Sequence, residues 1–118
     1  MSYQGPNQDV EKIKVDRLIV DKRVELGFET LTAAGAVSVE TPVTYLVTSG
    51  AIAITLAVGL EGQVKTIIMV TDGGTATLTP TSYANGTTIT FDDALDNWQG
   101  IYHAGSWYSI GTPTATTA

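Results

Sequence analysis

The sequence contains no cysteine, so disulfide bonds, thiolate nucleophiles and zinc–thiolate sites are all excluded. It also contains a single histidine, His103, which leaves no second imidazole to help hold a metal. We therefore interpret His103 as a strand residue beside a turn, and not as a general base or a metal ligand. On these grounds we expect a protein that is not an enzyme and that holds no metal and no cofactor.

Charge is also scarce, because charged residues make up 15% of the chain against roughly 25% in a typical soluble domain. Residues 30–118 hold one basic residue, Lys65, and six acidic ones, which gives this stretch a net charge of −5. A stretch of this charge repels phosphate, so we expect no nucleic-acid partner. It also lacks the surface charge that keeps a monomer soluble, which favours a subunit that is partly buried against its neighbours. A monomer with a hydroxyl-rich surface is the alternative.

Long apolar runs are missing as well. The longest, Ala51–Leu60, is interrupted by Thr55 and Gly59 and is too short to cross a bilayer. The polar stretch Met1–Asp9 does not have the basic and then apolar pattern of a secretory leader. We therefore expect no membrane partner.

What the sequence does contain is threonine, 19 residues of it, in short segments that alternate between apolar and polar residues. Asp72-Gly73-Gly74 is typical of a hairpin, Asn85-Gly86 of a tight turn, and Ala104-Gly105 separates the two strands of a last hairpin. No internal repeat is evident. The pattern predicts an all-β fold, a β-sandwich or barrel that is jelly-roll-like and carries an extended N-terminal arm. The expected strands are 36–39, 43–48, 51–58, 64–71, 75–79, 87–91, 101–103 and 107–110.

Three regions follow from this pattern: an extended N-terminal arm over residues 1–29, a β body over residues 30–111 and a Thr-rich tail over residues 112–118. The arm alternates apolar and charged residues, which predicts two or three short strands between residues 10 and 28, with a helix over 10–23 as the alternative. Its charges alternate in sign, which suits docking on another protein surface. The tail is of low complexity, and we expect it to stay outside the core.

Two clusters of side chains invite a functional interpretation. Asp92, Asp93 and Asp96 form the only acidic cluster, but their spacing does not match an EF-hand loop, so we interpret them as a solvated turn. The aromatic residues gather late in the sequence and predict either core and subunit contacts or a platform on which sugar rings stack. The candidates for such a platform are Trp98, Tyr102, Trp107 and Tyr108.

Several motifs of the body occur together. A Gly-Gln-x-Lys strand begins at Gly62, a Gly-Gly turn lies at Gly73, a Gly-x-x-Ile-x-Phe strand begins at Gly86, and a Gly-x-Trp strand begins at Gly105. As a set they resemble the small β modules of tailed-phage virion proteins, such as capsid decoration (cement) proteins and segments of head fibres and knobs. The resemblance covers roughly residues 43–111. It implies a trimeric structural protein that binds the capsid shell or a fibre axis.

The chain has no collagen-like or coiled-coil shaft, which favours a decoration subunit over a fibre. We therefore expect a viral structural protein on the capsid surface of the virion, which forms a homo-oligomer, a trimer, and binds the major capsid protein to stabilise the phage head. The apolar arm residues expected to dock on the capsid or on a neighbouring subunit are Ile13, Val15, Leu18, Val20 and Phe28. The alternative is a phage fibre or knob segment, or a surface carbohydrate-binding module.

Overall fold

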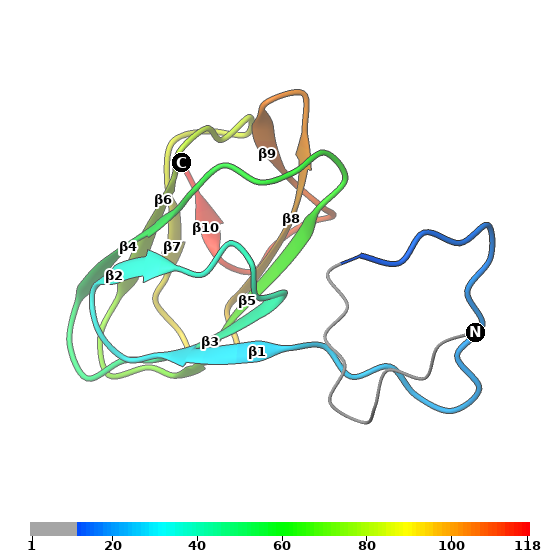
Figure 1. The fold of residues 1–118 in the computed structure, drawn as a ribbon. Coiled ribbons are helices and arrows are strands. Elements are labelled where there is room, and N and C mark those ends of the chain that lie inside the picture. The colour runs from blue at the N-terminus through cyan, green and yellow to red at the C-terminus, as the bar shows by residue number, and fades with distance from the viewer. Residues whose placement is uncertain (1–11) are drawn as a thin grey trace.

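The computed structural model describes residues 12–118, and in that part of the chain ten strands and no helix are found (Figure 1). The strands form two five-stranded sheets, ordered β1-β3-β5-β8-β9 and β10-β7-β6-β4-β2, which pack face to face as a sandwich. The strands are β1 (Phe28–Leu31), β2 (Gly35–Val37), β3 (Val43–Val47), β4 (Ile52–Leu56), β5 (Val64–Thr71), β6 (Ala76–Pro80), β7 (Ile89–Phe91), β8 (Asn97–His103), β9 (Ser106–Ser109) and β10 (Thr116–Thr117).

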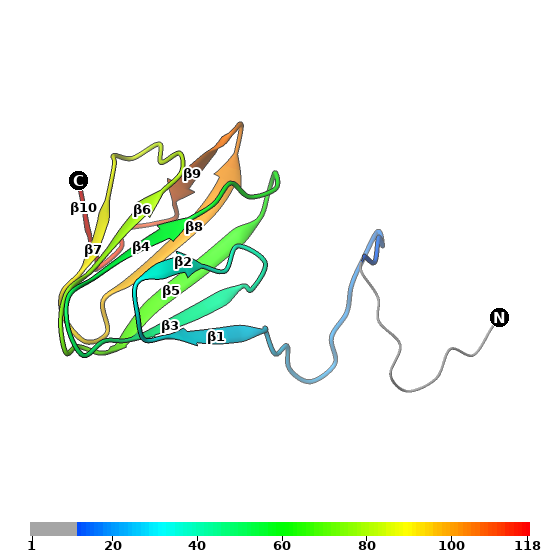
Figure 2. The same cartoon turned by 60° about the vertical axis from the view of Figure 1, so that its left-hand side comes forward.

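The first six strands wind around the core, because each successive strand crosses to the opposite sheet (Figure 2). In one sheet β1, β3 and β5 are parallel, and in the other β2, β4 and β6 are parallel. Neighbouring parallel strands need a long crossover, and here a strand of the facing sheet provides it in place of a helix. The all-β sandwich is thus confirmed. The jelly-roll-like arrangement is wrong, because a jelly roll is built from antiparallel Greek keys.

The inward faces of the strands follow the two-residue period of the sequence. In β3 the inward residues are Thr44 and Leu46, and in β5 they are Lys65, Ile67 and Met69. Together with apolar residues of the facing sheet they form one continuous core. The side chains that are completely buried there include Leu56, Leu78, Ile89, Phe91, Trp98 and Trp107.

The segment Asp72-Gly73-Gly74 is a corner between the two sheets, and the hairpin predicted there is wrong. A Cβ atom on Gly73 would lie 2.2 Å from the carbonyl oxygen of Thr48, and one on Gly74 would lie 2.2 Å from the carbonyl carbon of Gly50. The two glycines therefore allow this corner to stack directly on the preceding corner of the winding. The predicted hairpin across Ala104-Gly105 is confirmed, since β8 and β9 pair there and both turn residues have positive φ.

The last strands close one end of the winding with antiparallel pairs, in which β7 joins β6 and β8 joins β5. Contrary to our expectation for residues 112–118, the tail reaches the sandwich, because β10 pairs with β7 and Ala115 is buried. The carbonyl oxygen of Ala118 accepts hydrogen bonds from the backbone amides of Thr87 and Thr88. Backbone pairing, which composition does not reveal, fixes this segment.

At the other end of the winding the chain enters through an extended arm that leaves the sandwich at β1 (Figure 2). Residues 12–27 contain no strand, so the strands predicted within this part of the arm are wrong. Their backbones find no neighbouring strand to pair with, and alternation alone does not make a strand. Residues 1–11, which include the start of the predicted arm, lie outside the described residues.

Candidate functional site

The arm presents apolar side chains to solvent without covering them. Every residue from 12 to 28 is exposed, and the exposed fractions of Ile13 and Leu18 are 72% and 75%. Val15 and Val20 are exposed in the same way. These four residues of the predicted docking set therefore lie together on one free segment, and it is the largest run of uncovered apolar surface in the described part of the chain.

Phe28, the fifth predicted docking residue, belongs to the body and not to the arm. It is the first residue of β1, and its ring lies 5.5 Å from the ring of Tyr45 on β3. Its side chain is nevertheless 65% exposed, so it extends the apolar surface of the arm onto the edge of the sandwich.

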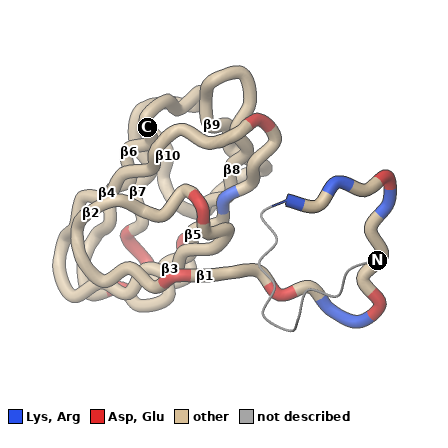
Figure 3. Tube along the Cα trace, viewed as in Figure 1, with Lys and Arg blue, Asp and Glu red and all other residues tan. Residues whose placement is uncertain are grey.

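The arm also carries nearly all of the positive charge (Figure 3). Residues 12–27 hold five basic and three acidic residues, whereas residues 28–118 hold one basic and seven acidic residues. The arm's two ion pairs, Lys22 with Asp21 and Arg23 with Glu25, are local and exposed. Lys12, Lys14 and Arg17 have no ion-pair partner among residues 12–118. Residues 12–27 are therefore net positive and the body is net negative, although Asp9 and Glu11 make residues 1–27 as a whole neutral.

Lys65, the single basic residue of the body, contributes nothing to the surface because it is completely buried. Its Nζ donates hydrogen bonds to the carbonyl oxygens of Ser38 and Thr41 at 2.8 and 2.5 Å and to the hydroxyl of Thr44 at 2.7 Å. The carboxylate of Glu29 lies 4.0 Å away and accepts hydrogen bonds from the Ser38 amide and the Thr44 hydroxyl.

These contacts attach the β2–β3 loop and the edge strand β1 to the central strand β5. Burial lowers the pKa of Lys65 to about 8, an effect that the nearby Glu29 carboxylate partly opposes. Lys65 is therefore a structural cation that joins three elements at the end of the winding where the arm begins. Its amine is enclosed, so it is not available as a nucleophile.

Most of the predicted sugar-stacking aromatics lie in the core. Trp98 and Trp107 are completely buried, their rings meet edge to face at 6.2 Å, and the Tyr102 ring lies 5.2 Å from Trp107. The indole nitrogen of Trp98 donates to the Ser109 hydroxyl, and that of Trp107 donates to the Ala57 carbonyl oxygen. A sugar platform made of Trp98, Tyr102 and Trp107 is therefore wrong, because these ring faces pack against protein. Tyr108 alone is exposed.

His103 lies on the surface, where its Nδ1 is 2.6 Å from Oε2 of Glu61. The same carboxylate accepts a hydrogen bond from the backbone amide of Ala104 at 2.9 Å. These two contacts, the amide first, lower the pKa of Glu61. The pair ties the β8–β9 turn to the loop after β4.

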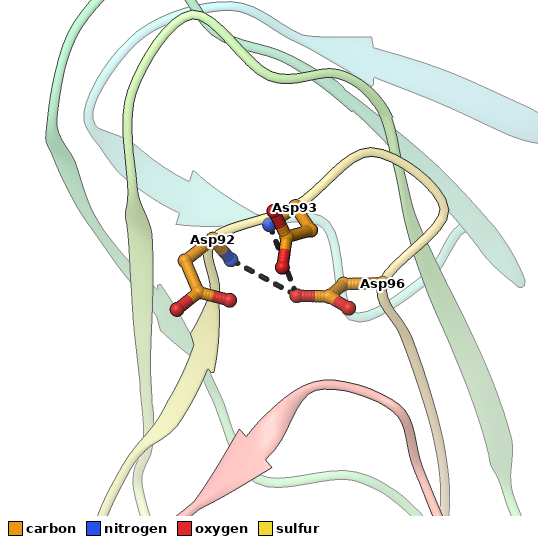
Figure 4. A group of neighbouring side chains, drawn as sticks. All are labelled: Asp92, Asp93 and Asp96. Carbon is orange, nitrogen blue, oxygen red and sulfur yellow. Dashed lines mark hydrogen bonds between the residues drawn. The ribbon is translucent and has the colours of Figure 1, made fainter.

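The acidic cluster forms a turn between β7 and β8 (Figure 4). Asp96 Oδ2 accepts hydrogen bonds from the backbone amides of Asp92 and Asp93 at 3.0 and 3.1 Å, as a turn-capping aspartate does. The side chain of Asp96 raises the pKa of the Asp92 carboxyl. The three carboxylates lie close enough to share a cation, with their nearest oxygens within 4.8 Å of one another. No second observation among residues 12–118 points to a ligand at this turn.

Sequence reasoning missed the part played by Lys65 and Glu29. The signal was present, since Lys65 occupies an inward position of the most β-rich segment and is the only cation of the body. It also missed an apolar groove between the β2–β3 and β4–β5 loops, because these loops are far apart in the sequence and become neighbours only when the strands wind around the core.

Comparison of the chain with protein-family descriptions, with curated proteins and with solved structures finds no match. No helix that is long and apolar enough to span a membrane occurs within residues 12–118. Any functional conclusion therefore depends on the arm, the body and their surfaces.

Proposed function

We propose that this chain is a structural subunit of a phage virion, a capsid decoration protein that self-associates as a trimer and binds the major capsid protein. One observation carries the proposal: a free arm exposes Ile13, Val15, Leu18 and Val20, while the body it precedes has a complete core of its own. Uncovered apolar residues in such number are typical of a segment that becomes buried on a partner.

The distribution of charge supports the same proposal. The surface of the body carries no lysine or arginine side chain, because Lys65 is buried, so it attracts the basic residues of an arm and repels nucleic acids. The resemblance of residues 43–111 to phage decoration modules supplies the capsid as the partner. A subunit that binds only the assembled shell stabilises that shell by mass action.

Light scattering of the purified chain tests self-association. We expect a particle of about 37 kDa, three times the 12.4 kDa of one chain. A mass that stays at 12.4 kDa at high protein concentration would contradict the trimer.

Capsid binding is tested by co-sedimentation with expanded shells of a tailed phage that carries this chain. The full-length variant Leu18→Asp/Ile19→Asp/Val20→Asp places charges where apolar contacts with the shell are needed, and we expect it to lose shell binding at least about tenfold. Leu95→Asp is the control, because Leu95 is equally exposed but lies on the body. If the triple variant decorates shells as well as the wild type does, the arm is not the docking segment.

A carbohydrate-binding role is not proposed, because Trp98 and Trp107 are buried in the core.

A further inference from the structure

The body has an apolar groove beside the root of the arm. It lies between the β2–β3 loop, which supplies Val39 and Glu40, and the β4–β5 loop, which supplies Val58, Leu60 and Gln63, and its volume is about 470 Å³. That volume is within the range of roughly 300–1,000 Å³ found for binding pockets.

The walls of the groove are held in place. The Gln63 side-chain amide donates to the carbonyl oxygen of Val39 and so bridges the two loops, while its oxygen accepts a hydrogen bond from the Leu60 amide at 2.9 Å. The backbones of Gln63 and Gly62 are bonded to Tyr102 on β8. Because the groove is already formed, a partner that binds it does not need to order its walls.

The chemistry of the groove selects one kind of partner. Leu60 and Val58 are 78% and 54% exposed, so the groove offers uncovered apolar surface, and the Glu40 carboxylate lies exposed among the lining residues. Glu40 is the only acidic residue among those that line the groove. The groove therefore suits an extended segment that alternates apolar and basic residues.

The arm is such a segment. Ile13 and Val15 fall on one side of an extended chain, and Lys12 and Lys14 have flexible stems long enough to turn toward acidic groups beside the groove. In this structure the arm runs outward from β1 and all of residues 12–28 are exposed, so the arm does not occupy the groove of its own chain (Figure 2).

We infer that residues 12–15 of one copy dock in the groove of a second copy, with Ile13 and Val15 against Val58 and Leu60 and with Lys14 paired to Glu40. The inference rests on the proposed self-association and names the surface that produces it. Exchange of arms around a ring buries Ile13 and Val15 of every copy and gives each groove one arm, while Leu18 and Val20 stay exposed for contact with the shell.

The absence of native cysteine allows a direct test by disulfide trapping in the full-length chain. Val15→Cys and a Leu60→Cys protein lengthened by an affinity tag are made separately, mixed and oxidised, and the disulfide product that joins one tagged and one untagged chain is followed on a non-reducing gel. We expect this product to form at least about tenfold faster than from Val15→Cys mixed with a tagged Leu95→Cys protein, because docking raises the local concentration of the two thiols. Leu95 is a matched control, with an exposed fraction of 74%.

A charge-swap series gives a second readout. Glu40→Lys should weaken self-association about tenfold, and the double variant Glu40→Lys/Lys14→Glu should recover most of that loss. Two results would overturn docking of the arm in the groove while leaving self-association standing. One is equal disulfide trapping at positions 60 and 95, and the other is a Glu40→Lys variant that forms the trimer as well as the wild type does. A double variant Val15→Cys/Leu60→Cys that closes only within one chain would also overturn this docking. A wild-type protein that stays monomeric would instead remove the proposed self-association itself.

Discussion

Lys65 is the residue on which the end of the winding depends. Its ammonium group donates to two loop carbonyls and one hydroxyl and offsets the charge of Glu29. Removing the amine would leave the two carbonyls without this donor and would leave the Glu29 carboxylate, which still accepts from Ser38 and Thr44, without its counter-charge. Replacing one member of a buried charged network costs more than the network contributes in total, because the remaining polar groups stay desolvated.

We expect Lys65→Met to lower the free energy of unfolding by about 3 kcal/mol at neutral pH, since the stem is kept but the hydrogen bonds are lost. Urea denaturation followed by tryptophan fluorescence measures it, because Trp98 and Trp107 are buried. Lys22→Met is the control and should change stability by less than about 0.5 kcal/mol, because Lys22 is exposed. A loss as small as that of the control would show that the loop is held by other contacts.

The same residue makes stability depend on pH in an unusual direction. The pKa of Lys65 falls from 10.5 to about 8 on folding, so between these values the unfolded chain binds more protons than the folded chain. Stability therefore rises with pH across this window. We expect a gain of about 2 kcal/mol from about pH 7.5 to about pH 9.5, measured by urea denaturation at each pH. Lys65→Met should remove this dependence, and a wild-type protein that loses stability over the same window would contradict the assignment.

Among the elements, the corners between strands specify the fold as much as the strands do. The Asp72-Gly73-Gly74 corner rests on the Ser49-Gly50 corner so closely that neither Gly73 nor Gly74 has room for a Cβ atom. The spacing of the winding at this edge is therefore set by direct contact between backbones.

We expect Gly74→Ala to lower the free energy of unfolding by at least about 2 kcal/mol, because its methyl group would overlap the backbone of Gly50. Gly50→Ala is a matched control from the same contact: a Cβ atom there meets nothing within 4 Å, so the change should be below about 0.5 kcal/mol. Thermal denaturation of both variants compares them. Equal losses would mean that the loss of glycine itself, and not the contact between corners, sets the cost.

The sequence was informative about strands and much less so about their connections. Alternation located β3 and β4, because each buries one face and the two-residue period shows it. The β-rich composition of residues 64–71 located β5, and the Ala104-Gly105 turn located the β8–β9 hairpin. Alternation failed in residues 12–27, which alternate but have no strand to pair with. Gly73-Gly74 indicated a turn, but whether a turn leads to the neighbouring strand or to the facing sheet is decided by long-range packing, which local sequence does not encode.

The candidate site was predicted in part. The four arm residues from Ile13 to Val20 were identified because apolar side chains in a charge-rich segment are conspicuous. The aromatic residues were ambiguous, since Trp98 in a core and Trp98 on a surface have the same sequence. The groove was out of reach, because Val39 and Leu60 become neighbours only when the winding brings two loops side by side.

For the molecule as a whole, attraction between the basic residues of segment 12–27 and the acidic body makes association sensitive to salt. Residues 12–27 carry a net charge of +2 and residues 28–118 a net charge of −6. Attraction between exposed charges is screened over a distance of about 10 Å at 0.1 M salt.

We expect the apparent dissociation constant of the oligomer to rise about tenfold between about 0.05 M and about 0.5 M sodium chloride. Sedimentation equilibrium at each salt concentration measures it, and the arm variant Lys12→Gln/Lys14→Gln/Arg17→Gln should show a flatter response. Association that strengthens with salt would indicate that apolar contact alone holds the copies together.

The winding of β1 to β6 has a further consequence for how such a chain tolerates change in length. Each circuit adds one strand to each sheet, and the antiparallel strands β7 to β10 close only the final circuit. An insertion is therefore accommodated when it brings a full circuit, whereas one extra residue inside a strand turns its inward side chains outward. Duplication of a segment such as residues 43–63 would lengthen the molecule along the axis of the winding and would move the arm farther from strands β7 to β10. Neither the arm nor those closing strands would need to change.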